Sequence, residues 1–195
     1  MYDPKVIAGL IASLIGVLSY APYIRDIIKR KTKPHAYTWF VWGITSLLVF
    51  FFQYRAGGGA GTWLTLAGGL SVISIFLLSL RYGTRDITKK DALFLVLALV
   101  AFGLWIITNQ PLISVLLLIA IDMFGFLPTI RKSWSKPYTE TLFTYALYAL
   151  CLAISIYALH IYTLVTYLYP VVWLFGNGLF SVVLVVRRKQ VGKRK

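Results

Sequence analysis

The chain has 195 residues, of which 59% are hydrophobic and 13% charged, and its formal net charge is +14. A soluble domain of this length needs more polar surface than this composition provides, so an ordinary soluble fold is excluded. The Lys and Arg residues form short clusters beside apolar segments. This placement favours membrane topology over a nucleic-acid-binding surface.

Seven apolar segments predict membrane-spanning helices, since a helix crosses the hydrocarbon core with roughly 20 residues. They cover residues 5–25, 36–55, 60–81, 91–108, 112–131, 139–159 and 163–187. Basic clusters follow the first, third, fifth and seventh segments, and only Lys5 and Arg55 lie on the other side. Because positive loops are retained in the cytoplasm, the N-terminus is predicted outside and the C-terminus inside.

An internal repeat organises these segments. Residues 21–25 (APYIR) resemble residues 127–131 (LPTIR), and the Lys-Pro loop at 33–35 resembles that at 136–138. Each copy would hold three helices, and one additional helix between the copies would make them parallel. The sequence therefore predicts an all-α integral membrane protein with a 3+1+3 arrangement.

The predicted layout has four parts. Residues 1–86 form the first repeat, 87–110 the linker helix, 111–188 the second repeat and 189–195 a basic cytoplasmic tail.

The arrangement resembles the SWEET and PQ-loop superfamily. The likeness rests on the 3+1+3 topology and on a proline near the inner end of helices one and five. The family's Pro-Gln pair reads here as Pro22-Tyr23 and Pro128-Thr129. The resemblance implies a transporter of a small solute built from parallel repeats. Sugar is the first substrate class it suggests; a vitamin-like or amino-acid substrate with proton coupling is the rival.

Asp122 is the only acidic residue well inside an apolar segment. A carboxylate at mid-membrane costs about 2.5–3.5 kcal/mol on insertion scales, so it needs a proton, hydrogen bonds or a watery cavity. It is interpreted either as a substrate ligand or proton carrier, or as a structural group that ties two helices together.

Asn177 lies at mid-depth in the seventh segment, between two glycines that allow a helix or ligand to approach closely. Aligning Arg81 with Arg187 places Ser71 opposite Asn177. In sugar transporters of the resembling family, an asparagine on each third helix faces the pocket. The resemblance therefore implies an asymmetric pair of substrate-binding residues, Asn177 and Ser71; the alternative for Asn177 is helix packing.

Two tryptophans and two prolines complete the candidate set. Trp173 is four residues from Asn177 and therefore on the same helix face, which favours a cavity role. Trp42 falls opposite Tyr145 in the repeat and is predicted to line the same site. Pro22 and Pro128 are predicted to kink their helices, either as hinges of an inner gate or as fixed bends.

No spacing of metal ligands, phosphate loop or activated nucleophile is present, so we expect no enzyme, no metal and no cofactor. The expected partners are a small solute and the lipid bilayer, not nucleic acid, and a homo-oligomer is left open. A membrane receptor on the same fold is the alternative from another class. Very short loops suit a bacterial or archaeal inner membrane.

Overall fold

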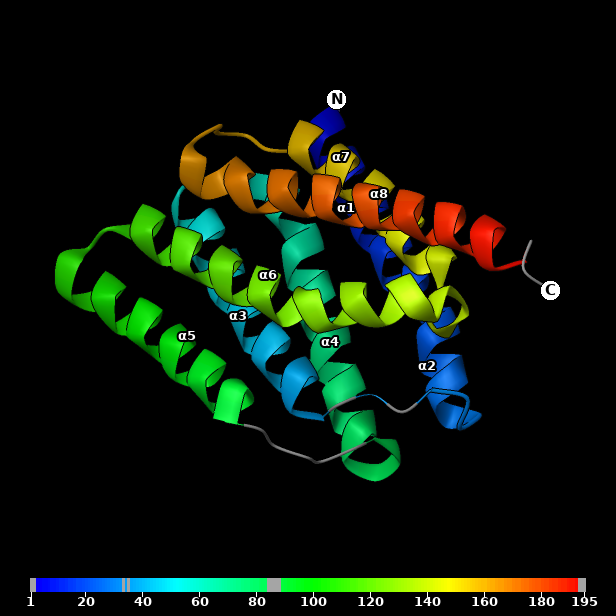
Figure 1. Cartoon of the computed structure of the whole chain (residues 1–195). Helices are drawn as coiled ribbons and strands as arrows, with labels where there is room; N and C mark the ends of the chain where they lie inside the picture. The colour runs from blue at the N-terminus through cyan, green and yellow to red at the C-terminus, as the bar shows by residue number, and fades with distance from the viewer. Residues whose placement is uncertain (1–2, 33, 35, 84–88, 193–195) are drawn as a thin grey trace.

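The structure, a computed structural model, describes residues 3–32, 34, 36–83 and 89–192. These residues fold into α-helices joined by short connections, with no β-strand among them (Figure 1). The elements are α1 (Pro4–Ser19), α2 (Ala21–Ile28), α3 (Ala36–Arg55), η1 (Gly59–Thr62), α4 (Trp63–Tyr82), α5 (Lys89–Thr108), α6 (Pro111–Ser135), η2 (Pro137–Thr139), α7 (Leu142–Tyr157) and α8 (Leu164–Gly192).

The surface of the bundle is apolar, which suits a lipid environment. Large side chains such as Leu14, Leu179 and Ile107 are 65%, 65% and 83% exposed. Monomeric soluble proteins rarely expose extended apolar surface. Within the described chain, three helical stretches are long and apolar enough to cross a membrane: Pro4–Ile28, Gly59–Tyr82 and Leu164–Gly192.

The helices follow the apolar segments closely. The bounds of α3 are the predicted ones, and α5 and α6 differ from their segments by a few residues. α8 continues to Gly192, so the first residues of the predicted tail are helical. Its last turns pack on the basic end of the bundle, where the Arg187 guanidinium lies 4.7 Å from the Trp134 ring centroid. Residues 193–195 lie outside the described part.

The two prolines of the repeat behave differently from one another. The first predicted rod is divided into α1 and α2 at Tyr20, and Pro22 occupies the first turn of α2. Proline is well suited to a first turn because it lacks the N–H that a helix start leaves unpaired. α6 instead continues through position 128 to Ser135. One proline removes a single backbone hydrogen bond, and the remaining ladder continues.

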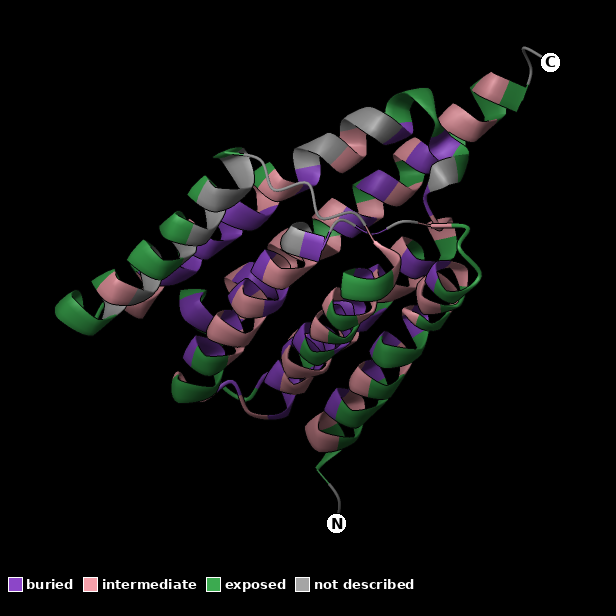
Figure 2. Cartoon of the chain, turned by 90° about the horizontal axis from the view of Figure 1, so that it is seen from below, coloured by how far each residue is buried: buried purple, intermediate pink, exposed green. Residues whose placement is uncertain are grey.

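In chain order, the helices other than α5 fall into a first group, α1 to α4, and a second group, α6 to α8. α4 contacts both α1 and α3, and α8 contacts both α6 and α7. The groups meet where α1 packs on α7 and α3 packs on α6, while α5 lies against α6 and α3. Figure 2 shows α1 starting at one end of the bundle and α8 finishing at the other, with buried residues on the facing sides.

The connection between α3 and α4 depends on glycine. Gly57 and Gly59 have φ angles of 79° and 60°, in the left-handed region that glycine adopts without strain. A Cβ on Gly61 would lie 2.6 Å from both the Leu159 nitrogen and the Ser155 carbonyl oxygen. The turn therefore sits directly against the end of α7, and the two groups of helices touch closely here.

Candidate functional site

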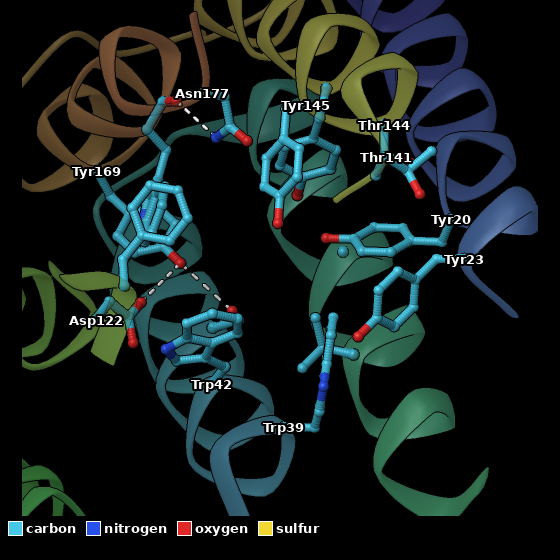
Figure 3. A pocket seen from close by; sticks show the side chains of 16 residues that line it. Tyr20, Tyr23, Trp39, Trp42, Asp122, Thr141, Thr144, Tyr145, Tyr169 and Asn177 are labelled. Atoms are coloured by element: carbon cyan, nitrogen blue, oxygen red, sulfur yellow. Dashed lines mark hydrogen bonds between the residues drawn. The ribbon is translucent and has the colours of Figure 1, made fainter. Parts of the chain in front are cut away.

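A cavity of about 110 Å³ lies between the two groups of helices. Its walls are mainly aromatic. The first group contributes Tyr20, Tyr23, Trp39 and Trp42, and the second contributes Phe126, Tyr145, Tyr148, Tyr169 and Trp173. In Figure 3, Asp122 lies on one side of the cavity and Tyr20 and Tyr23 lie across from it.

Asp122 lies near the middle of α6 and is 1% exposed. The Thr45 hydroxyl of α3 donates to its Oδ1 at 2.7 Å, and the Tyr169 hydroxyl of α8 donates to its Oδ2 at 3.1 Å. Asp122 lines the cavity and also joins three helices. The interpretation of Asp122 as a solute ligand or proton carrier is therefore compatible with its interpretation as a structural group, because the same carboxylate lines the cavity and connects the helices.

Removing either hydroxyl donor should destabilise the protein. Tyr169→Phe and Thr45→Val each leave one oxygen of a buried carboxylate without its donor, which costs about 1.5–3 kcal/mol for a charged group. Ser46→Ala is the matched control, because the Ser46 hydroxyl is 3.4 Å from that of Tyr169, whereas the described hydroxyl donors to Asp122 are those of Thr45 and Tyr169. Unfolding free energies in one detergent should fall clearly for the first two variants and little for Ser46→Ala. Equal losses in all three variants would contradict the role assigned to Asp122.

Asn177 and Trp173 both line the cavity from α8, one turn apart. The Asn177 side-chain nitrogen donates to the Trp173 carbonyl at 2.8 Å, which fixes the amide orientation. Its oxygen points toward the Tyr145 side of the cavity in Figure 3. The Trp173 indole N–H is buried without a hydrogen bond of ordinary geometry, and it lies close enough to Asp122 to interact with that carboxylate. The two residues thus bring polar groups to an aromatic wall.

Trp42 lines the cavity from α3 and lies close to α6. A Cβ on Gly125 would lie 2.8 Å from the Trp42 Nε1, so glycine makes room for the indole. The Trp39 ring packs edge-on against Trp42, with 5.6 Å between centroids. The two indoles form one wall of the cavity.

Ser71 does not line the cavity. It is 8% exposed, and its hydroxyl donates to the Ala67 carbonyl of the same helix at 2.8 Å. The lining positions of α4 are Gly68 and Val72. Position 71 therefore lies between two lining positions of α4, but the Ser71 side chain bonds to its own backbone.

Sequence reasoning did not single out the cavity tyrosines. A buried tyrosine in an apolar helix needs a partner for its hydroxyl, and this is the signal that marks such positions. Tyr145 was visible only as the repeat counterpart of Trp42. Its hydroxyl donates to Glu140 at 3.0 Å, and Arg188 donates to the Glu140 carbonyl at 2.6 Å. The cavity therefore borders a buried carboxylate at the end of the bundle that carries the basic loops.

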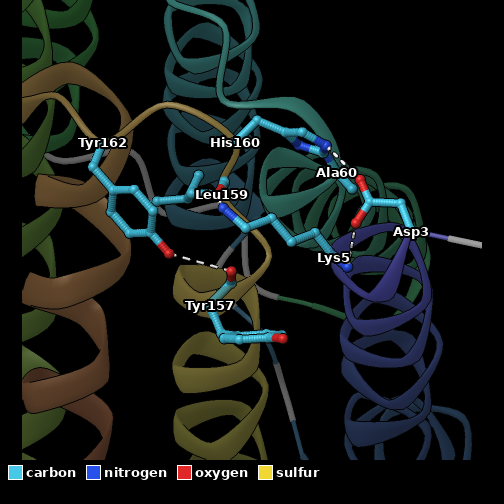
Figure 4. Close-up of polar contacts among 7 residues, drawn as sticks. All are labelled: Asp3, Lys5, Ala60, Tyr157, Leu159, His160 and Tyr162. Carbon is cyan, nitrogen blue, oxygen red and sulfur yellow. Dashed lines mark hydrogen bonds and ion pairs between the residues drawn. The ribbon is translucent and has the colours of Figure 1, made fainter.

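The opposite end of the bundle is closed by polar contacts. His160 lies 3.1 Å from the Asp3 carboxylate, and the Lys5 ammonium donates to the Leu159 carbonyl at 2.6 Å (Figure 4). The Ala60 N–H also donates to His160 at 3.4 Å. These bonds connect the start of α1 and the glycine turn to the α7–α8 connection, so they join the two groups of helices.

The Asp3–His160 contact should make this end sensitive to acid. The backbone N–H of Lys5, followed by His160, lowers the pKa of Asp3 below its ordinary value of 3.8. A lowered folded-state pKa stabilises the fold above the ordinary value, and the contribution is lost as pH falls through the lowered pKa. Asp3→Asn keeps an N-capping oxygen but removes the charge. Its melting temperature should therefore lie slightly below that of the wild type at pH 6, and the gap should close toward pH 3. A gap that persists at pH 3 would contradict this assignment.

No group of His, Cys, Asp and Glu that could hold a metal ion occurs among the residues that the structure describes. No protein-family model, curated protein or solved structure matches this chain. The site must therefore be interpreted from its own geometry.

Proposed function

We propose that the chain is a secondary transporter or facilitator of a small polar solute, which binds at mid-membrane between two three-helix repeats. In this proposal seven rods span the membrane: α1 with α2, then α3, η1 with α4, α5, α6, α7 and α8. The proposed fold is that of the SWEET and PQ-loop superfamily. The bacterial or archaeal inner membrane remains the proposed location.

The packing of the helices supports the two-repeat architecture. Exchanging the repeats maps α1, α3 and α4 onto α6, α7 and α8. Under this exchange the central position of α4 corresponds to that of α8, and the α1–α7 contact corresponds to the α3–α6 contact. Parallel repeats related in this way are typical of such transporters.

The observation that carries the proposal is the cavity between the repeats. It extends from Asp122 and Asn177, near the middle of their helices, to Tyr23, Trp39 and Thr141, near the helix ends that carry the basic loops. The other end is closed by the Asp3–Lys5–His160 contacts. This arrangement supports a carrier that is open to the cytoplasm and closed to the outside, with the orientation taken from the charge pattern.

Proposed roles follow for the lining residues. Asp122, Asn177, Trp173 and Trp42 contact the solute, and the Trp173 indole N–H, which lies beside Asp122, donates to that carboxylate. The break between α1 and α2 provides a hinge, because Tyr20 and Tyr23 on either side of Pro22 line the cavity. Pro128, within the continuous α6, is a weaker hinge candidate.

The test is uptake into proteoliposomes that contain the purified protein, with empty liposomes as the control. A panel of labelled sugars, amino acids, vitamins and organic cations should include at least one solute that accumulates or equilibrates faster than in empty liposomes. An imposed pH gradient separates proton coupling from facilitated diffusion. If solutes bind the protein but none crosses the membrane, the protein is a receptor and the proposal fails.

A further inference from the structure

The charge of the cavity differs from that of the chain. The chain carries twenty Lys and Arg residues against six acidic ones. Among the described residues that line the cavity, Asp122 is the only acidic side chain, and none is Lys, Arg or His. The nearest further carboxylate is Glu140, which is bonded to the lining Tyr145. The cavity therefore favours cations over anions.

The hydrogen bonds of Asp122 leave room for a ligand. An ionised carboxylate offers about four lone-pair sites; the Thr45 and Tyr169 hydroxyls occupy two of them, and the Trp173 indole lies close to the same carboxylate. Hydroxyl donors orient the carboxylate but bring no positive charge. A buried charge without an opposite charge is unfavourable, so a bound cation would compensate it.

The walls of the cavity are suited to the same kind of ligand. Aromatic ring faces attract cations, and cages of several rings recognise methylated ammonium groups. Trp39 and Trp42 form one wall, and Tyr20 and Tyr23 face Asp122 across the cavity (Figure 3). At about 110 Å³ the space is comparable to the cavity of about 150 Å³ that holds benzene in an engineered protein. It accommodates one ring or one small substituted ammonium.

Two other solute classes fit less well. A zwitterionic amino acid would bring a carboxylate, for which the described lining has no basic partner. A sugar needs many hydrogen-bond partners, but several polar groups of the lining are already committed within the protein. Thr144 donates to the Ser19 carbonyl at 2.9 Å, Tyr145 donates to Glu140, and the Asn177 side-chain nitrogen donates to Trp173.

We infer that the cavity binds a small monovalent organic cation, with its charge on a methylated ammonium or an N-alkylated flat ring, paired with Asp122 and covered by the aromatic walls. The inference rests on the proposed function of this cavity as the solute site. It replaces sugar as the preferred substrate class.

Binding to the purified full-length protein in detergent tests this inference with three molecules of similar size. Choline is the cation, 3,3-dimethylbutan-1-ol is its neutral carbon analogue, and glycine betaine is the zwitterion. We expect choline to bind about tenfold or more tightly than either of the others, since a desolvated cation–π site contributes about 2 kcal/mol. Equal binding of choline and the neutral alcohol, tighter binding of betaine, or no binding of choline would overturn the inference.

A variant pair locates the charge. Asp122→Asn should reduce the choline preference to near unity, whereas Asp26→Asn, the same chemical change outside the cavity, should preserve it. A choline preference that survives in a folded Asp122→Asn protein would also overturn the inference. The wild-type ligand comparison stands by itself if Asp122→Asn does not fold. Uptake of a neutral solute together with no choline binding would contradict the cation inference but not the transport proposal. Choline binding without uptake of any solute would contradict the transport proposal but not the cation inference.

Discussion

Asp122→Asn should abolish uptake while leaving the bundle folded, and Asp122→Ala should lose both uptake and stability. The amide oxygen still accepts from one of the two hydroxyls, Thr45 or Tyr169, and the other hydroxyl can turn to accept from the amide nitrogen, but the amide cannot carry charge or a transferable proton. Removing one member of a buried charge pair costs about 2–5 kcal/mol in binding, which corresponds to a loss of about 30-fold or more. Initial uptake rates in proteoliposomes measure this loss.

The alanine variant isolates the structural contribution. It leaves the Thr45 and Tyr169 hydroxyls without the carboxylate, but each hydroxyl has a second hydrogen-bond partner nearby. The Trp42 carbonyl lies 3.0 Å from the Thr45 hydroxyl, and Ser46 lies 3.4 Å from that of Tyr169. The loss should therefore stay near the lower end of the range for unsatisfied donors, about 2 kcal/mol. For a protein of this size this corresponds to a fall of about 4–8 °C in melting temperature. If Asp122→Asn transports at the wild-type rate, the carboxylate is structural only.

Gly68→Leu should block the cavity. Gly68 lines it from α4, and a Cβ at this position would collide with the Tyr148 hydroxyl. A leucine side chain has to occupy the cavity or displace the tyrosine, and overpacking of this kind costs about 1–3 kcal/mol. Uptake and ligand binding should both fall about tenfold or more, because the leucine side chain occupies space that the solute needs.

Gly178→Leu is the matched control for this change. Gly178 is also a helical glycine near the centre of its helix, but a Cβ there meets nothing within 4 Å. This variant should transport close to the wild-type rate. Equal losses in the two variants would show that added bulk anywhere in the bundle impairs transport, and the cavity would lose its special role.

Much of the helical framework was predictable because membrane helices are coded by simple hydropathy. A run of about 20 apolar residues can satisfy its backbone in lipid only as a helix, so segments such as 36–55 are located directly. The break at Tyr20 lies where Pro22 predicted a kink in the first helix, because proline marks an interruption that hydropathy alone does not reveal. The end of α8 was missed: the apolar segment ends at residue 187, whereas the helix continues through basic residues to Gly192.

The sequence singled out lining residues where a polar side chain occurs in an apolar helix, because burying such a group in lipid is unfavourable. Asp122 and Asn177 are polar groups in apolar helices, and the fold places both in one cavity. Ser71 was misplaced because a serine can satisfy its hydroxyl on its own helix, so its sequence position does not reveal which way it points. The tyrosines were missed because the amphipathic tyrosine ring occurs in lipid interfaces, in helix contacts and in cavities, so its sequence position does not distinguish these environments.

The central claim is that one cavity between the repeats becomes accessible from each side of the membrane in turn. Ser46→Cys places a thiol in the cavity wall, and the native Cys151 is buried at 0% exposure and serves as the background. A membrane-impermeant thiol reagent is applied to either face of uniformly oriented proteoliposomes. The account predicts labelling of Ser46→Cys from both faces, faster from the face that carries the C-terminus, with none in the parent protein. Labelling from one face only, or from neither, would contradict it.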